Sequence, residues 1–194
     1  MTSEMQDRKR ELRAELRAGR AARTPEERAT AARALTANLI AVTQRFEAKS
    51  VAAYFSTEEE PDMMPFLQWA RDNDVAVILP IVREDGLLDW AEHRGPVASG
   101  ILGILEPDGD PLPPNALGEV DLILVPAAAV DREGTRLGWG RGFFDKTLGS
   151  MEQSPLVYAV VFADELRDEI PAEEHDQAVD GVVSDEGITD IPRS

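Results

Sequence analysis

A ten-residue string rich in glycine, RLGWGRGFFD at residues 136–145, constrains the fold of this chain more than any other segment. Its glycines stand at every second position, which exposes backbone N–H groups and permits positive φ angles, so an anion can lie against bare backbone. Upstream, residues 121–126 predict a buried strand, and downstream residues 143–148 predict the first turns of a helix. Strand, loop, glycine-rich turn and helix in this order are typical of anion sites in α/β proteins. We call residues 136–145 the glycine loop.

Apolar and helical patterns alternate along the rest of the chain. We expect strands at residues 51–55, 75–79, 87–90, 121–125, 156–162 and 179–183, and helices at residues 4–22, 25–46 and 62–73. Pro80 should close the second strand. The second helix should begin at Thr24, because Thr24, Pro25 and Glu27 match a capping box with proline in the first turn. Residues 95–114, rich in glycine and proline, predict a long ordered loop of the kind that lines sites.

Strands that alternate with helices indicate a mostly parallel sheet. We therefore predict a single α/β domain over residues 1–194, with a mostly parallel sheet flanked by helices. Its N-terminal helical pair lies in residues 1–46 and its α/β core in residues 51–194.

Composition narrows the class of protein. Hydrophobic residues make up 43% of the 194 residues, which favours a globular chain with a sizeable core. The absence of cysteine excludes disulfides, thiolate metal sites and cysteine nucleophiles. No apolar run approaches the length of a membrane span or a signal peptide, and the net charge of −17 argues against a nucleic-acid partner. We expect a cytoplasmic monomer that binds neither membranes nor nucleic acids.

The charge is unevenly spread, because the first 24 residues hold seven basic and four acidic side chains. Five of the basic residues fall within about 100° of arc on the first predicted helix: Lys9, Arg10, Arg13, Arg17 and Arg20. This face could bind an anion. A solvated face stabilised by ion pairs one turn apart explains the same pattern, and the charges alone do not decide between the two.

The glycine loop combines groups suited to a nucleotide. Arg136 and Arg141 can contact phosphate oxygens with forked geometry, and Asp145 offers an oxygen ligand to Mg²⁺. The spacing matches neither the Rossmann nor the Walker fingerprint, which disfavours a P-loop NTPase. The alternative is a tight connection between a strand and a helix that binds nothing.

Acidic residues occur at two further places. Residues 58–60 follow the first predicted strand, at the carboxyl end where open α/β sheets bind ligands, and Glu60 could accept hydrogen bonds from substrate N–H groups. We interpret Glu58 and Glu59 as a solvated turn. Near the end of the chain, Asp176 follows His175 and is a candidate oxygen ligand for Mg²⁺.

With these pieces placed, the sequence resembles the 5-formyltetrahydrofolate cyclo-ligase family, also called 5,10-methenyltetrahydrofolate synthetase. The resemblance extends over nearly the whole chain, and the glycine loop is its most specific part. The other matching segments are residues 9–13, Phe55 and Ser56 followed by Glu60, residues 103–107, residues 121–126, residues 175–176 and residues 179–180. The chain departs from the family pattern at Met63, where threonine is common, and at Trp139, Phe143 and Phe144.

The resemblance implies ATP-dependent and Mg²⁺-assisted conversion of 5-formyltetrahydrofolate to 5,10-methenyltetrahydrofolate, with release of ADP and phosphate. ATP would phosphorylate the formyl oxygen, and N10 would then close the ring. It implies catalytic roles for Arg136, Arg141 and Asp145, and Mg²⁺ ligands at Asp145 and Asp176. The implied ATP-binding residues are Lys9, Arg10, Arg13, Arg136, Gly138, Trp139, Gly140, Arg141, Gly142, Phe143 and Phe144. The implied folate-binding residues are Phe55, Glu60, Trp139 and Phe144.

Two other functions suit a phosphate-binding loop on an α/β sheet. A non-catalytic sensor of phosphorylated ligands would use the same loop, although such sensors carry a separate signalling or DNA-reading module. A sugar-phosphate isomerase would need a general base in the pocket and no basic N-terminal helix.

Overall fold

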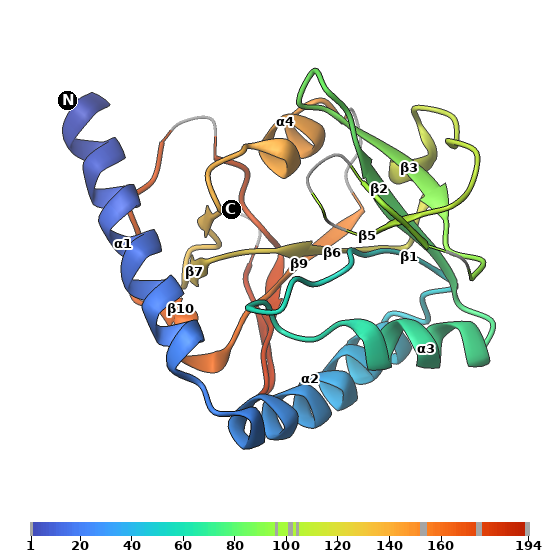
Figure 1. Cartoon of the computed structure of the whole chain (residues 1–194), viewed down its shortest axis with the longest axis horizontal. Helices are drawn as coiled ribbons and strands as arrows, with labels where there is room; N and C mark the ends of the chain where they lie inside the picture. Colours follow the sequence, from blue (N-terminus) through green and yellow to red (C-terminus); the bar gives the residue numbers. More distant parts are fainter. Residues whose placement is uncertain are drawn as a thin grey trace.

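The computed structural model describes residues 2–95, 97–100, 103, 105–151, 155–173 and 176–192. A seven-stranded sheet with the order β12-β11-β9-β6-β1-β2-β3 crosses the middle of the molecule (Figure 1). Its strands are β1 (Ser50–Ala52), β2 (Ala76–Val82), β3 (Leu88–Glu92), β6 (Leu122–Pro126), β9 (Leu156–Val160), β11 (Gly181–Val183) and β12 (Ile188–Asp190). The five central strands are parallel, and β3 and β12 pair antiparallel at the two edges. The mostly parallel α/β sheet predicted from the sequence is confirmed.

Helices cover both faces of this sheet because its central strands are apolar on both sides. On β6, Leu122 and Leu124 pack toward α2 (Pro25–Arg45) and α3 (Met64–Asp72). The alternate residues Ile123 and Val125 belong to the core on the opposite face, which includes Leu148 of α4 (Phe143–Gly149). The period of two along the strand therefore builds two cores, one for each layer of helices.

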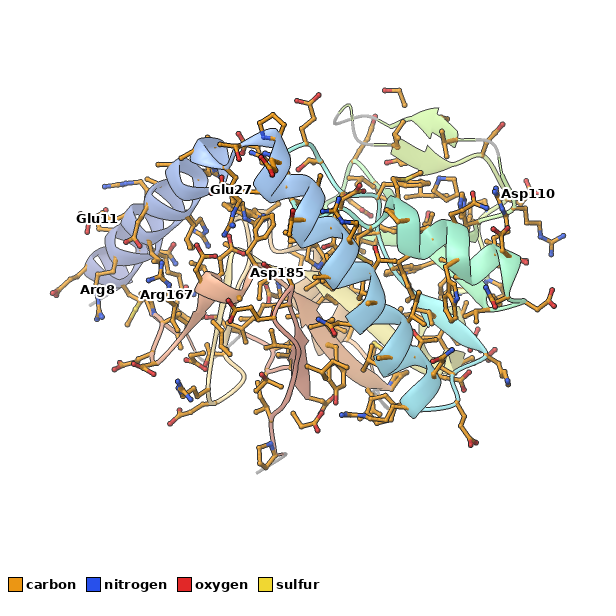
Figure 2. All side chains as sticks on the ribbon, turned by 90° about the horizontal axis from the view of Figure 1, so that it is seen from below. Arg8, Glu11, Glu27, Asp110, Arg167 and Asp185 are labelled. Carbon is orange, nitrogen blue, oxygen red and sulfur yellow. The ribbon has the colours of Figure 1, made fainter. Side chains whose placement is uncertain are left out.

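The N-terminal helix α1 (Thr2–Ala22) lies on a different, smaller sheet. This sheet has the order β10-β7-β8, from β7 (Ala129–Asp131), β8 (Arg136–Leu137) and β10 (Leu166–Arg167). Leu16 packs against Ala129, Leu137 and Ile170. Figure 2 shows Arg8 and Glu11 on the outer side of α1, where both are exposed. Within the described residues, no helix is long and apolar enough to cross a membrane.

The predicted N-terminal helical pair is confirmed, together with the start of its second member. The Thr24 hydroxyl accepts a hydrogen bond from the Glu27 amide at 3.2 Å, and the Glu27 carboxylate accepts one from the Thr24 amide at 2.8 Å. Pro25 occupies the first turn of α2. Arg28, one residue further, donates to the carbonyl oxygens of Arg20 at 2.5 Å, Arg23 at 3.3 Å and Glu58 at 2.9 Å. One guanidinium therefore joins α1, the turn after it and the loop that follows β1.

Two expectations for the middle of the chain are wrong. Pro80 does not close the second strand, since β2 continues to Val82. The Ile78 carbonyl accepts a hydrogen bond from the Ala53 amide, just beyond the end of β1. Backbone groups of residues two apart in a strand point to the same side, so the backbone nitrogen of Pro80 also points toward β1. At the level of Pro80, however, β1 has already ended. No ladder bond is lost there. Residues 95–114 also contain a small antiparallel hairpin, β4 (Val97–Ser99) and β5 (Leu105–Pro107). Single-turn 3₁₀ helices η1 (Ala116–Glu119) and η2 (Ala163–Glu165) complete the described elements.

Candidate active site

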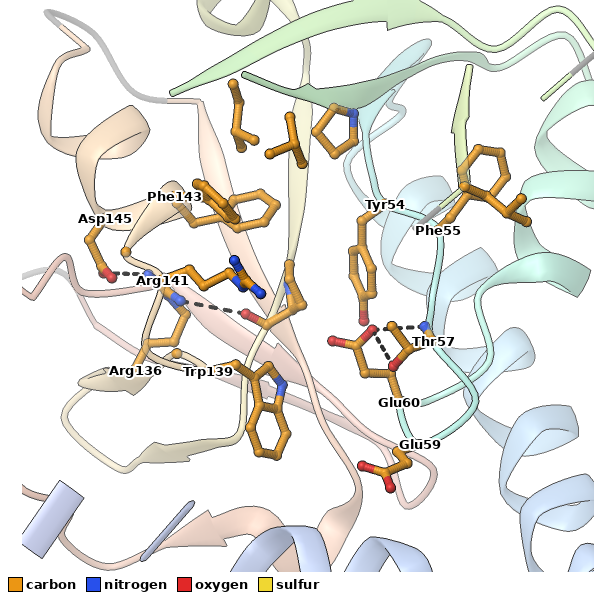
Figure 3. A pocket seen from close by; sticks show the side chains of 18 of the residues that line it. Tyr54, Phe55, Thr57, Glu59, Glu60, Arg136, Trp139, Arg141, Phe143 and Asp145 are labelled. Carbon is orange, nitrogen blue, oxygen red and sulfur yellow. Dashed lines mark hydrogen bonds and ion pairs between the residues drawn. The ribbon is translucent and has the colours of Figure 1, made fainter. Parts of the chain in front are cut away.

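A cavity of about 310 Å³ opens beyond the carboxyl ends of β1 and β6 (Figure 3). Its walls come from α1, the residues that follow β1, the edge of β2, the β4–β5 hairpin and the glycine loop. The lining residues are Arg17, Arg20, Tyr54, Phe55, Thr57, Glu59, Glu60, Pro80, Val82, Leu88, Leu105, Glu106, Pro126, Arg136, Gly138, Trp139, Arg141, Gly142, Phe143, Phe144 and Asp145. Most of the glycine loop and both predicted folate contacts outside it, Phe55 and Glu60, therefore face one space.

The glycine loop needs glycine for two different reasons. Gly140 and Gly142 adopt φ angles of +97° and +69°, which strain any residue with a β-carbon. A β-carbon at Gly138 would lie 3.1 Å from Nη1 of Arg136, so this position keeps space for the guanidinium. The loop thus bends tightly around a buried cation.

That cation, Arg136, begins β8 and is only 3% exposed. Its Nη2 donates to Oδ1 of Asp145, and its Nη1 lies 3.5 Å from the Pro126 carbonyl oxygen. Burial lowers the pKa of Arg136, while the Asp145 carboxylate acts in the opposite direction. The predicted catalytic pair Arg136 and Asp145 is therefore an ion pair in the wall of the cavity.

The N-terminal helix brings two more basic residues beside the glycine loop, neither of which lines the cavity itself. Arg13 donates from Nε to the Gly138 carbonyl oxygen at 2.8 Å, and burial lowers its pKa, with the neighbouring Arg17 acting in the same direction. Lys9 is 3% exposed, and its Nζ lies 2.6 Å from Oδ2 of Asp176 and 2.9 Å from Oε2 of Glu173. We call Lys9, Arg13, Arg136, Asp145 and Asp176 the charged cluster.

Two predicted ATP contacts stand apart from this cluster. Arg10 is 75% exposed at its side chain and pairs with Asp7 at 2.9 Å, so the structure places it on the wet face of α1. Arg141 lines the cavity, is exposed, and has no ion pair or hydrogen bond from its side chain within the described ranges. It is therefore available to an incoming anion, whereas Arg10 points elsewhere.

The two predicted metal ligands, Asp145 and Asp176, belong to one electrostatic neighbourhood, because both influence the pKa of Arg13 and of Arg136. Each already pairs with a cation. In the part of the chain that the structure describes, no three histidine, aspartate or glutamate side chains gather as a metal site. His175 lies outside the described residues. Two carboxylates are a suitable donor set for an ion that takes its other oxygens from phosphates and water.

The other end of the cavity carries aromatic and acidic side chains. Phe55 is 4% exposed and meets the His93 ring edge-on at 5.4 Å between centroids. The Glu60 carboxylate accepts from the backbone amide of Thr57 at 2.9 Å and from its hydroxyl at 3.1 Å, which fixes the carboxylate at the cavity wall. Figure 3 shows Phe143 on the wall opposite Tyr54 and Phe55.

Sequence reasoning did not assign several lining residues, namely Arg17, Arg20, Tyr54 and Glu106. Arg17 and Arg20 share the basic face of α1, and this pattern alone could not separate contact from solvation. Glu106 accepts from the Val82 amide at 2.9 Å, which joins the hairpin to β2. Tyr54 stands just beyond β1, one residue before Phe55, and its place at a strand's carboxyl end was the available signal.

Comparisons with known proteins agree on one family. Residues 5–185 match the model of the 5-formyltetrahydrofolate cyclo-ligase family. The chain is 40% identical to the 5-formyltetrahydrofolate cyclo-ligase of Mycolicibacterium smegmatis over 146 residues, covering 72% of this chain and 75% of that protein. It is 28% identical to the mouse enzyme of the same name, covering 90% and 92%.

Solved structures agree with the sequence matches. The solution structure of Aquifex aeolicus 5,10-methenyltetrahydrofolate synthetase superposes with a TM-score of 0.81 at 28% identity, covering 96% of this chain and 94% of that one. The corresponding protein of Mycoplasma pneumoniae, at 20% identity with coverage of 92% and 99%, shares the fold with a TM-score of 0.74. On the match of its sequence over 181 of 194 positions and on its fold, the chain belongs to the 5-formyltetrahydrofolate cyclo-ligase family.

Proposed function

We propose that the cavity closes 5-formyltetrahydrofolate to 5,10-methenyltetrahydrofolate by phosphorylating the formyl oxygen with ATP, assisted by Mg²⁺. The overall conversion follows from membership of the family, which also sets aside the sensor and isomerase alternatives. The route and the residue roles are our proposal. The observation that carries them is that a cationic wall and a carboxylate-bearing pocket face one cavity.

The chemistry requires activation because a formyl oxygen on nitrogen is a poor leaving group. The γ-phosphoryl group of ATP is transferred to this oxygen, a C–O–P linkage forms, and ADP leaves. N10 then attacks the formyl carbon and releases its proton, the five-membered ring closes, and inorganic phosphate departs with the former formyl oxygen. No protein nucleophile takes part, so the protein contributes positioning and electrostatic stabilisation.

The charged cluster and its neighbours would hold the nucleotide. Lys9, Arg13 and Arg136, with the exposed Arg141, supply cations, and the glycine loop supplies backbone N–H groups. Arg136 and Arg141 would stabilise charge on the transferred phosphoryl group. Arg136 is already oriented by Asp145, so little reorganisation is needed when the charge develops.

Asp145 and Asp176 would hold Mg²⁺, which when bound neutralises charge on the triphosphate. The donor set fits this ion, since both are carboxylates that lie within one electrostatic neighbourhood. Lys9 and Arg136 hold these carboxylates in place in the free protein.

The folate would occupy the opposite part of the cavity. Phe55, Trp139 and Phe144 offer ring faces and edges to an aromatic substrate, and Glu60 offers an acceptor to its N–H groups. The formyl group would then point toward the glycine loop. A cytoplasmic location and a monomeric state remain predictions from composition.

The test is an absorbance assay for the methenyl product with purified protein and 5-formyltetrahydrofolate. Product should form only when ATP and Mg²⁺ are both present. Product formed without ATP would contradict phosphorylation of the formyl oxygen. A folded sample that forms no product with every component present would contradict the proposed function as a whole.

A further inference from the structure

Unsatisfied hydrogen-bond donors gather around the cavity. Among the described residues, four of its lining side chains carry a buried polar atom that has no hydrogen-bond partner: Arg20 at Nη1, Tyr54 at the hydroxyl, Arg136 at Nε and Trp139 at Nε1. Buried polar groups in folded proteins are nearly always hydrogen-bonded, so a set of unsatisfied donors around one space indicates a ligand that brings acceptors. Arg136 belongs to the charged cluster. The other three lie outside it.

Arg20 is fixed so that one nitrogen remains for a ligand. It is 1% exposed, and its Nε and Nη2 donate to the two carboxylate oxygens of Glu165 at 2.6 and 2.8 Å. Nη2 also donates to the Ala127 carbonyl oxygen at 2.8 Å. The Glu165 carboxylate balances the guanidinium charge. Nη1 is therefore a rigidly held donor, and it belongs to an ion pair whose net charge is zero. Such a donor suits a neutral acceptor better than an anion.

Tyr54 supplies the second donor. It is 4% exposed at the carboxyl end of β1, and Figure 3 shows its ring pointing toward Glu60. Burial raises the pKa of Tyr54 well above its ordinary value; the Glu60 carboxylate adds to this and Arg20 opposes it. The hydroxyl thus stays protonated and lies within the electrostatic reach of both charged groups. Trp139 stacks under the Arg20 guanidinium at 4.7 Å from ring centroid to Cζ.

We propose that Tyr54 and Arg20 bind the ring carbonyl oxygen of the pterin while Glu60 binds the adjacent ring N–H and amino groups, so that these three residues determine specificity for the 4-oxo-2-amino edge. The proposal rests on the proposed function and adds to it the two donors. It makes Tyr54 a substrate-contacting residue and Glu165 a positioning residue for Arg20.

The other oxygens of the substrate do not suit the position beside Tyr54, Arg20 and Glu60. The carboxylates of the glutamate tail would be repelled by Glu60. The formyl oxygen must lie beside the transferred phosphoryl group, at the glycine loop. The amide that joins the benzoyl group to the glutamate tail is trans, so its carbonyl oxygen and its N–H point in opposite directions. The ring edge places a carbonyl oxygen directly next to N–H donors on one side, which is the pattern that a carboxylate beside two donors complements.

The experiment measures binding without nucleotide, by calorimetry, for the wild type and for Tyr54→Phe. Two ligands are used, 5-formyltetrahydrofolate and a fragment without the tail, 5-formyl-6-methyltetrahydropterin. Tyr54→Phe should weaken both by the same factor of about ten, since one hydrogen bond to the shared ring is lost. The KM for ATP should stay unchanged. The melting temperature should stay the same or rise, because a buried hydroxyl without a partner has been removed.

The chain offers a matched control, because its second tyrosine is Tyr158. This hydroxyl donates to Asp190 at 2.6 Å and accepts from Arg45 at 3.0 Å, and it does not line the cavity. Tyr158→Phe should lower the melting temperature and leave both affinities unchanged. Tyr54→Phe is thus expected to lower affinity without lowering stability, and Tyr158→Phe to lower stability without lowering affinity.

Three results would overturn the inference. The first is an unchanged affinity of Tyr54→Phe for both ligands. The second is a loss of affinity for the full substrate alone, which would place the Tyr54 hydroxyl at the glutamate tail. The third is failure of the wild type to bind the fragment at millimolar concentration. An active wild type combined with any of these overturns the assignment of Tyr54 and Arg20 alone. An inactive but folded wild type overturns the proposed function instead.

Discussion

The two ends of α1 each bury a cation, but they hold it in different ways. Arg20, near the end of the helix, makes a two-point contact with Glu165 and a further bond to a backbone carbonyl. Lys9, near the beginning, makes single contacts with Asp176 and Glu173, whose side chains are 10% and 17% exposed. A forked guanidinium in a dry pair fixes geometry, whereas an ammonium beside partly wet carboxylates can exchange partners. We therefore call the part of α1 at Arg20 its anchored end, and the part at Lys9, one of the proposed ATP contacts, its binding end.

The anchored end should be the more costly of the two to break. Arg20→Met leaves the Glu165 carboxylate buried without a counterion, with only the Phe162 amide still donating to it, and we expect a loss of about 3–5 kcal/mol in the free energy of unfolding. Urea titration at pH 7 measures it. Lys9→Met is the comparison, with a smaller expected loss because its carboxylate partners reach water. Equal losses in the two variants would contradict the distinction between the anchored end and the binding end.

Substitution in the charged cluster should act on catalysis more than on folding. Asp145→Asn keeps the size of the side chain and removes one negative charge, so turnover should fall by about ten- to a hundredfold and the Mg²⁺ concentration for half-maximal rate should rise. Thermal stability should fall less than in Arg20→Met, because the amide oxygen of the asparagine can still accept from Arg136. A destabilised variant with an unchanged Mg²⁺ requirement would instead assign Asp145 to fixing Arg136.

The binding end of α1 can be tested by nucleotide selectivity. Lys9→Ala combined with Arg13→Ala should raise the KM for ATP by about tenfold or more, since hydrogen bonds to charged groups contribute about 1.5–3 kcal/mol each. Binding of 5-formyltetrahydrofolate without nucleotide should remain. Arg10→Ala on the exposed face of the same helix is the control and should change neither. An unchanged KM in a folded double variant would mean that Lys9 and Arg13 do not contact ATP and that the buried Lys9 serves only its ion pairs with Asp176 and Glu173.

The smallest expected effect concerns pH. Burial raises the pKa of Glu165 above its ordinary 4.5, with the Arg20 hydrogen bond opposing it, so the folded state binds more protons than the unfolded state just above pH 4.5. This carboxyl's contribution to stability should therefore decline as pH rises through that window. Glu165→Gln keeps an acceptor for Arg20 and should flatten the dependence in unfolding curves taken between pH 4 and 7. A slope identical to that of the wild type would contradict the raised pKa.

The parts of the fold that depend on local chemistry could be predicted. The start of α2 follows from Thr24 and Glu27, three residues apart, and the strand at β6 follows from an unbroken apolar run. The strands β7, β8 and β10 escaped prediction because two or three residues carry no period, and their pairing is set by distant segments. The burial of Arg20 on the basic face of α1 could not be predicted for the same reason, since it depends on Glu165, which lies 145 positions away. The lining of the cavity was predictable where its residues are adjacent in sequence, as in the glycine loop. Tyr54 carried only the weaker signal of its place at the carboxyl end of a strand.

The guanidinium of Arg28 limits which side chains position 28 of this chain can hold. It donates to three carbonyl oxygens, those of Arg20, Arg23 and Glu58, and so sets the distance between the anchored end of α1 and the loop that carries Glu60. A lysine offers a single nitrogen and cannot reach three acceptors spread over this fork. Substitution at position 28 is therefore coupled to the shape of the loop after β1. A variant that loses this arginine also loses the support of the cavity wall that carries Glu60.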